Sequence, residues 1–260
     1  MKEEILSRLP RNHPWCHRIH YYDVIESTNT EAKRMAQAGA PEGTVLIADT
    51  QTGGRGRLGR SFHSPAGSGI YMSVILRPNM PPDQLMHLTC AVAVALCDAV
   101  EQTLGFRPGI KWINDLVVDT KKLAGILTEL SVNSQGLVDW AIVGIGLNCN
   151  QTSFPPELQD IACSATMVTG QPIDWATLSA AIIQALFQMD LTNPRQTMAL
   201  YRNDCVTLGR DVTVIRGTQM YDGRAVEIQD DGALTVLRRD GQTEIVNSGE
   251  VSVRGLFGYA

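Results

Sequence analysis

One short stretch of the sequence combines glycine with arginine: residues 51–60 read QTGGRGRLGR. Glycine lets the backbone adopt conformations that other residues avoid, and each arginine presents a permanent charge with paired donors for carboxylate or phosphate oxygens. If the segment is extended, Arg55 and Arg57 point to the same side. The stretch therefore indicates a loop that holds an anion. A solvated basic loop and an RNA-binding segment are the alternatives, whereas a P-loop is excluded because GxxxxGK[ST] does not occur.

Two further stretches bring lysine into apolar, strand-like runs. KWIND (111–115) ends one run, where Asn114 and Asp115 could approach a polar ligand or form an ordinary turn. KKLAGIL (121–127) opens another run with two lysines, and strand alternation turns one of them inward. An inward lysine supplies a compact positive charge for phosphate or carboxylate oxygens, and the alternative is an edge strand that lysines protect against aggregation.

Two shorter motifs carry a weaker signal. ESTN (26–29) places two hydroxyls and an amide at the start of a helix, where N-capping is the alternative to ligand contact. GIGLN (144–148) ends a strand, and glycine inside a strand often marks the close approach of a ligand or another backbone. Neither motif is decisive alone, but all five occur in one order within the first 150 residues.

The apolar pattern places these motifs among strands and helices. Strands are predicted at 19–25, 44–49, 69–77 and in the runs IKWINDLVV, KLAGILTEL and VDWAIVGIGLN. Helices are predicted at 27–39, with Thr28 and Glu31 at capping-box spacing, at 83–104, and near 174–190 and 195–207. From residue 209 onward, short alternating strands separated by Asp-Gly turns at 222–223, 231–232 and 240–241 predict a small all-β barrel. We therefore expect a larger domain of strands and helices (1–208) and a small β domain (209–260).

Composition and charge limit the classes of function. The 260 residues are 44% hydrophobic with a net charge of −5, which is typical of a folded globular chain and argues against a protein that coats nucleic acid. The six cysteines show no CxxC or zinc-ligand spacing, so we expect reduced thiols in a cytoplasmic protein. The sequence shows neither a secretory apolar region nor an apolar run of membrane length, so no membrane association is expected.

The succession ESTN, QTGGRGRLGR, KWIND, KKLAGIL, GIGLN and a β-rich C-terminus resembles the biotin–protein ligases, from about Glu26 to Arg254. The resemblance implies an α+β fold: a mixed β-sheet flanked by helices, similar to class II synthetases, followed by a small SH3-like β-barrel. It implies an enzyme that joins biotin to ATP with Mg²⁺, forming biotinyl-5′-AMP and pyrophosphate. The biotinyl group then passes to one lysine of the biotin carboxyl carrier protein, a subunit of acetyl-CoA carboxylase.

The resemblance also implies roles for individual residues. Those expected at biotin are Ser27, Thr28, Asn29, Gln51, Gly54, Arg55, Gly56, Arg57, Lys122 and Gly125. Those expected at ATP are Arg55, Arg57, Arg60, Phe62, Asn114, Lys122 and Asn148. Arg57 and Lys122 are expected to act in catalysis by offsetting the repulsion between the biotin carboxylate and the α-phosphate. Asp115 is the candidate base for the incoming amine, and the metal ligands stay unassigned.

The sequence departs from the family pattern at Ile113, where relatives usually have proline, and we expect this to affect local rigidity rather than chemistry. About 25 residues precede Ser27, too few for the DNA-binding domain of some relatives, so no DNA binding is expected. A homodimer is compatible with the resemblance. A lipoate–protein ligase and a non-enzymatic biotin-sensing or nucleic-acid-binding module are the alternative functions.

Overall fold

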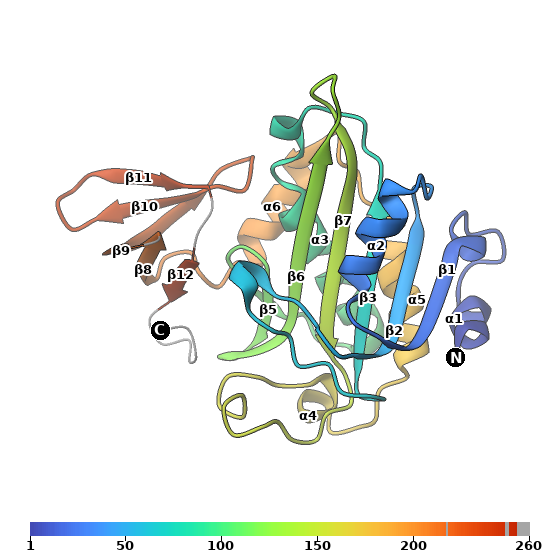
Figure 1. The fold of residues 1–260 in the computed structure, drawn as a ribbon. Helices are drawn as coiled ribbons and strands as arrows, with labels where there is room; N and C mark the ends of the chain where they lie inside the picture. The colour runs from blue at the N-terminus through green and yellow to red at the C-terminus, as the bar shows by residue number, and fades with distance from the viewer. Residues whose placement is uncertain (217, 248–249, 254–260) are drawn as a thin grey trace.

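The computed structural model describes residues 1–216, 218–247 and 250–253. Its main body is a seven-stranded mixed sheet in the order β1-β2-β3-β7-β6-β5-β4 (Figure 1). The strands are β1 Ile19–Ile25, β2 Thr44–Gln51, β3 Gly69–Leu76, β4 Gly109–Lys111, β5 Asp115–Val118, β6 Lys121–Val132 and β7 Val138–Asn148. β1 and β2 pair in parallel, and the other neighbours pair antiparallel.

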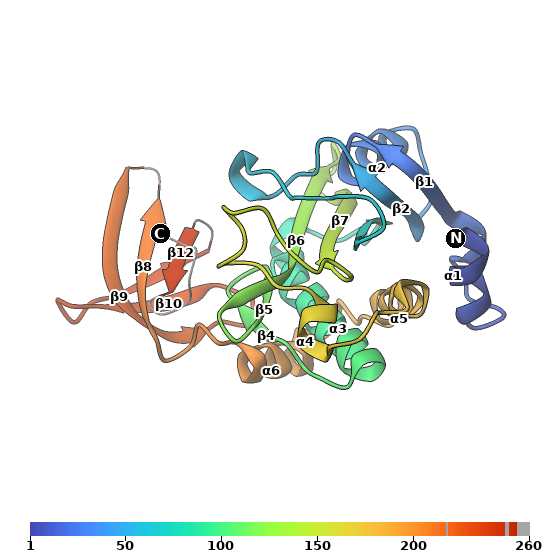
Figure 2. The ribbon, with the colours of Figure 1, turned by 90° about the horizontal axis from the view of Figure 1, so that it is seen from below.

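Helices cover both faces of this sheet, as Figures 1 and 2 show. α2 (Thr28–Gln37) lies on one face, and α3 (Leu88–Leu104), α5 (Trp175–Phe187) and α6 (Pro194–Asp204) lie on the other. Because both faces are covered, the inner strand β3 is buried along almost its whole length, and its sequence is apolar except at Ser73. The predicted α+β fold with a mixed sheet flanked by helices is confirmed.

Two predicted helix boundaries are corrected. α2 is capped by Ser27, whose Oγ accepts the Thr30 N–H at 3.5 Å, so the capping box expected from Thr28 is wrong by one residue. The expected helix 83–104 is a 3₁₀ turn at Pro82–Leu85 followed by α3, which ends at Gly105 as predicted. By length and composition alone this stretch could cross a membrane, which the sequence analysis did not anticipate. It is nevertheless 72% buried, as in the core helix of a globular fold.

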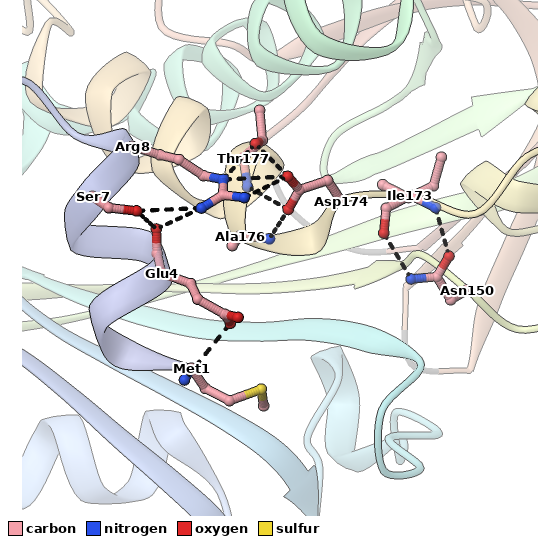
Figure 3. A network of polar contacts seen from close by, with 9 residues as sticks. All are labelled: Met1, Glu4, Ser7, Arg8, Asn150, Ile173, Asp174, Ala176 and Thr177. Atoms are coloured by element: carbon pink, nitrogen blue, oxygen red, sulfur yellow. Dashed lines mark hydrogen bonds and ion pairs between the residues drawn. The ribbon is translucent and has the colours of Figure 1, made fainter.

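The N-terminal residues form a helix of the main body that was not predicted from the sequence. α1 (Lys2–Arg8) packs beside α5, and the Arg8 guanidinium pairs with Asp174 at 3.0 Å (Figure 3). Asp174 also caps the first turn of α5. In the same view, the Asn150 side chain holds both backbone groups of Ile173, at 2.8 and 3.1 Å. These contacts join α1, the start of α5 and the segment after β7 into one unit.

The C-terminal residues form a separate, smaller antiparallel sheet in the order β11-β10-β9-β8-β12 (Figure 1). Its strands are β8 Asp211–Arg216, β9 Gln219–Ile228, β10 Leu234–Arg238, β11 Thr243–Val246 and β12 Glu250–Val253. The β-rich C-terminal unit is thus present, and its closure into an SH3-like barrel stays a prediction. The predicted domain boundary at 208/209 falls between α6 and β8.

The three Asp-Gly pairs of this unit do not behave alike. Gly232 and Gly241 occupy turns at φ values of +89° and +84°, as predicted. Gly223, however, lies inside β9, so the turn predicted there is wrong. A Cβ at this position would overlap Val236 of the neighbouring strand, and glycine is therefore needed for strand packing rather than for a turn.

Candidate active site

Two adjoining cavities lie between the 51–60 loop and strands β5, β6 and β7. The small cavity has a volume of about 50 Å³, and the large cavity has a volume of about 240 Å³. The residues that line both are Gly56, Arg57, Phe62, Asn114 and Lys122. An arginine and a lysine therefore stand where the two cavities meet.

The structure separates the two predicted sets of ligand residues between these cavities. All residues predicted to contact biotin line the small cavity except Gly54. All residues predicted to contact ATP line the large cavity except Arg55, which lines the small one. A Cβ on Gly54 would come within 2.6 Å of the Phe62 carbonyl oxygen, so this glycine serves the folding of the loop.

The 51–60 loop is tied to the turn that links β4 and β5. Arg57 donates a hydrogen bond from Nη1 to Oδ1 of Asn114 at 2.8 Å, and Asn114 donates from Nδ2 to the Ile126 carbonyl at 2.9 Å. Residues 112–114 form this turn, so the single strand expected for IKWINDLVV is divided into two. The Trp112–Ile113 peptide bond is cis. The arginine of one motif thus contacts the asparagine of another across 57 residues of sequence.

Lys122 is the inward lysine of KKLAGIL. Its Nζ lies 2.8 Å from Oδ1 of Asp115 and 5.9 Å from the centre of the Phe62 ring. Lys121 points elsewhere and donates to the Gln159 carbonyl. A Cβ on Gly125 would come within 2.9 Å of the Lys122 side chain, so glycine leaves room for the lysine. Because β6 lies between β5 and β7, the edge-strand alternative is wrong.

The start of α2 supplies the polar end of the small cavity. Gln51 Oε1 accepts hydrogen bonds from the backbone and hydroxyl of Thr28, at 2.9 and 3.1 Å. Ser27 caps the helix while also lining the cavity, so capping and a place in the site are compatible. The ESTN motif therefore caps the helix and also lines the small cavity, while its contact with a ligand stays a prediction.

Two residues behind this end were not found from the sequence. Ser73 Oγ lies 2.6 Å from Oδ1 of Asn29, and Asn29 donates from Nδ2 to Glu129 at 3.0 Å. These contacts hold the Asn29 amide in one orientation. The available signal for Ser73 was a lone small polar residue in the otherwise apolar run GIYMSVIL. Glu129 gave no such signal, because KKLAGILTELSV contains several other polar residues.

The glycines of GIGLN make room for side chains that line the cavities. A Cβ on Gly144 would overlap the Asn29 amide, and a Cβ on Gly146 would lie 2.6 Å from the Phe62 ring. Asn148 is 5% exposed and donates to the Cys163 carbonyl at 3.1 Å, so it also ties the floor of the large cavity together. A ligand or another backbone was expected to approach these glycines, whereas in the structure the side chains of Asn29 and Phe62 occupy the space.

The large cavity has a cationic side and an apolar side. Sequence reasoning placed Arg57, Arg60 and Lys122 there but gave no role to Lys111, which is 3% exposed and also lines it. The apolar wall was missed, since it comes from a segment without regular structure. Its residues are Phe154, Leu158, Ile161 and Ala162. A flat apolar ring and a chain of phosphates would match these two sides.

The two cysteines nearest the cavities are not poised as nucleophiles. Burial raises the pKa of Cys149 to about 12 and that of Cys163 to about 11, so both thiols near the cavities stay protonated at neutral pH. Among the described residues, no three His, Cys, Asp or Glu side chains gather as a metal site. Asp115, 6% exposed, is the carboxylate that lines the large cavity.

Comparison with known proteins identifies the family. The profile of the Biotin/lipoate A/B protein ligase family matches residues 21–148, and that of the biotin protein ligase C terminal domain matches residues 207–254. The Bifunctional ligase/repressor BirA of Bacillus subtilis is 36% identical over 88% of this chain and 72% of its own length. The Biotin--[acetyl-CoA-carboxylase] ligase of Mycobacterium tuberculosis is 34% identical over 86% of this chain and 85% of its own. This chain belongs to the biotin protein ligase family.

A solved structure agrees with this assignment. The biotin protein ligase from Aquifex aeolicus in complex with biotin and ATP superposes with a TM-score of 0.77 at 28% identity. The match covers 91% of this chain and 98% of that one. It therefore includes both the main body and the C-terminal sheet.

Proposed function

We propose that this protein is a biotin protein ligase that makes biotinyl-5′-AMP from biotin and ATP and then biotinylates a lysine of the acetyl-CoA carboxylase carrier protein. The observation that carries the proposal is the pair of cavities that meet at Arg57 and Lys122. Relatives named biotin--[acetyl-CoA-carboxylase] ligase, and a structural neighbour that holds biotin and ATP, support it. They favour biotin over lipoate.

Biotin is assigned to the small cavity and ATP to the large one. The end of the small cavity at Ser27 and Gln51 offers hydroxyl and amide groups that suit a ureido ring. The biotin carboxylate then lies toward the junction. In the large cavity, the apolar wall suits adenine, and the cationic side suits the phosphates. This placement brings the carboxylate and the α-phosphate together beside Arg57 and Lys122.

In the first step, a carboxylate oxygen of biotin attacks the α-phosphorus of ATP. A phosphorus–oxygen bond forms, the bond from the α-phosphorus to the oxygen that bridges to the β-phosphorus breaks, and pyrophosphate leaves. Two anions approach each other, so the charges of Arg57 and Lys122 lower the barrier by stabilising the transition state. Magnesium enters as part of the substrate, bound to the ATP phosphates.

In the second step, the neutral amine of the carrier lysine attacks the carbonyl carbon of the adenylate. The carbon–oxygen bond to AMP breaks, and the nitrogen loses a proton. Asp115 remains the candidate acceptor for this proton. Asp115 also pairs with Lys122 through Oδ1 at 2.8 Å, so it holds that lysine in place as well.

The test is to incubate the protein with ATP, Mg²⁺, biotin and a carrier domain, and to weigh the carrier by mass spectrometry. A gain of one biotinyl group is expected, and Lys122→Ala should abolish it. Lys121→Ala is the matched control, since the neighbouring lysine lies outside both cavities. A gain with lipoate but not with biotin would move the assignment to lipoate ligases, and no gain with either would contradict ligase activity.

A further inference from the structure

The turn between β9 and β10 (229–233) reaches from the C-terminal sheet to the wall of the large cavity. Its Gly232 carbonyl accepts a hydrogen bond from the indole Nε1–H of Trp112 at 2.9 Å. Trp112 is 4% exposed and lines the large cavity. A backbone group of the small sheet therefore holds a side chain of the proposed nucleotide site directly.

The turn that carries Trp112 is held at several other points. The Trp112 N–H donates to Thr207 Oγ1 at 2.9 Å, and the Tyr201 hydroxyl donates to the Ile113 carbonyl at 3.2 Å. At its far end, Asn114 accepts the hydrogen bond from Arg57 at 2.8 Å. A short path of contacts thus runs from Gly232 through residues 112–114 to the arginine at the junction of the cavities.

Gly232 fits its place tightly. Its φ of +89° favours glycine, and a Cβ there would lie 2.9 Å from Cys90 Sγ and 3.8 Å from Ile113 Cδ1. Arg202 of α6 fixes the start of the same turn by donating from Nε to the Ile228 carbonyl at 2.6 Å. The turn is therefore seated between α3, α6 and the Trp112 turn, with little space for a side chain.

None of the described residues after 208 lines either cavity. We propose that Gly232 is a positioning residue for ATP, through which the C-terminal sheet holds Trp112 and the 112–114 turn in the geometry that binds the nucleotide. The sheet then influences the first reaction step without touching the ligand in this arrangement. The inference rests on the proposed ligase function and adds a positioning contact to it.

Gly232→Ala tests this inference, and Gly241→Ala is its matched control. Both glycines follow aspartate in turns of the same sheet at similar positive φ, but a Cβ on Gly241 would meet nothing within 4 Å. Biotin-dependent exchange of labelled pyrophosphate into ATP measures the first step. In Gly232→Ala we expect the KM for ATP to rise about fivefold, the factor that one lost neutral hydrogen bond typically produces. The KM for biotin should rise less than the KM for ATP, because Trp112 lines only the large cavity, and Gly241→Ala should change neither constant.

Trp112→Phe provides an independent test, because it keeps an aromatic ring in a smaller form and removes the indole donor. It should also raise the KM for ATP, by a similar factor. If the two substitutions break the same contact, the double variant should be no worse than the more affected single variant. If circular dichroism shows that Gly232→Ala does not fold, Trp112→Phe alone tests the inference.

The inference would be overturned by equal KM values for ATP in the Gly232 and Gly241 variants, by an equal rise in the KM values for biotin and ATP, or by fully additive effects in the double variant. An unchanged KM for ATP in Trp112→Phe would overturn it as well. Wild-type protein is measured in parallel. If it shows no biotin-dependent exchange at all, the proposed function fails, and this outcome is distinct from failure of the positioning contact.

Discussion

Replacement of Arg57 by alanine should release the adenylate intermediate early. The guanidinium of Arg57 lines both cavities and donates to Asn114 at 2.8 Å, so it ties the 51–60 loop to the site. A hydrogen bond from a charged donor contributes about 1.5–3 kcal/mol, which corresponds to about a 10- to 150-fold change in rate or equilibrium. Because Arg57 is only half-buried, we expect the lower end, about tenfold faster release.

The assay forms biotinyl-5′-AMP from biotin and labelled ATP with pyrophosphatase present, adds excess unlabelled adenylate, and follows the loss of label from the protein. Asn114→Ala removes the partner of the same hydrogen bond, so the two variants and their combination form a double-mutant cycle. The exposed Arg11 serves as the control, since Arg11→Ala removes an equal charge from the surface.

Retention of the adenylate by Arg57→Ala for as long as by the wild type would refute the idea that the loop holds the intermediate. Fully additive losses in the cycle would show instead that Arg57 acts through its charge alone and that the contact with Asn114 is irrelevant. Release that is faster in Arg11→Ala to the same extent as in Arg57→Ala would indicate that the net charge of the protein, rather than the loop, governs the rate.

Three other predictions concern packing and protonation. Gly146→Ala should weaken binding of both biotin and ATP in titration calorimetry, because its Cβ would lie 2.6 Å from the Phe62 ring that lines both cavities; unchanged affinities would mean that the ring is free to move. Ile5→Ala should lower the free energy of unfolding in urea by about 2–4 kcal/mol, because Ile5 of α1 is fully buried; a loss below 0.5 kcal/mol would show that α1 is not part of the folded core. Burial lowers the pKa of His13 from 6.5, so the unfolded chain binds its proton at a higher pH than the folded protein does. The free energy of unfolding is therefore unaffected by this group well above pH 6.5 and falls as the pH drops below 6.5. In chemical denaturation at pH 5, His13→Gln should lose less of its free energy of unfolding than the wild type does.

Local patterns in the sequence were sufficient for most elements of the main body. The strand predicted at 19–25 coincides with β1, and the helix expected to stop at Gly105 does so in a left-handed conformation. Strand alternation selected one inward lysine of KKLAGIL, and the structure places Lys122 inward. Such features depend on a few neighbouring residues, because side-chain alternation and helix capping are local properties of the backbone.

Other outcomes required contacts between distant parts of the chain. Nothing in GRAVEI indicates that Gly223 packs under Val236, and nothing in KWIND indicates that Trp112 bonds to Gly232, 120 residues later. The role of Ser73 behind Asn29 likewise depends on which strands are neighbours.

The sequence by itself therefore determined most strands, most helices and the chemical types in the site. The tertiary structure alone decided which side chains share a cavity and which backbone groups hold them. The physical reason is that strand order and register bring together residues whose separation along the chain leaves no local pattern to detect.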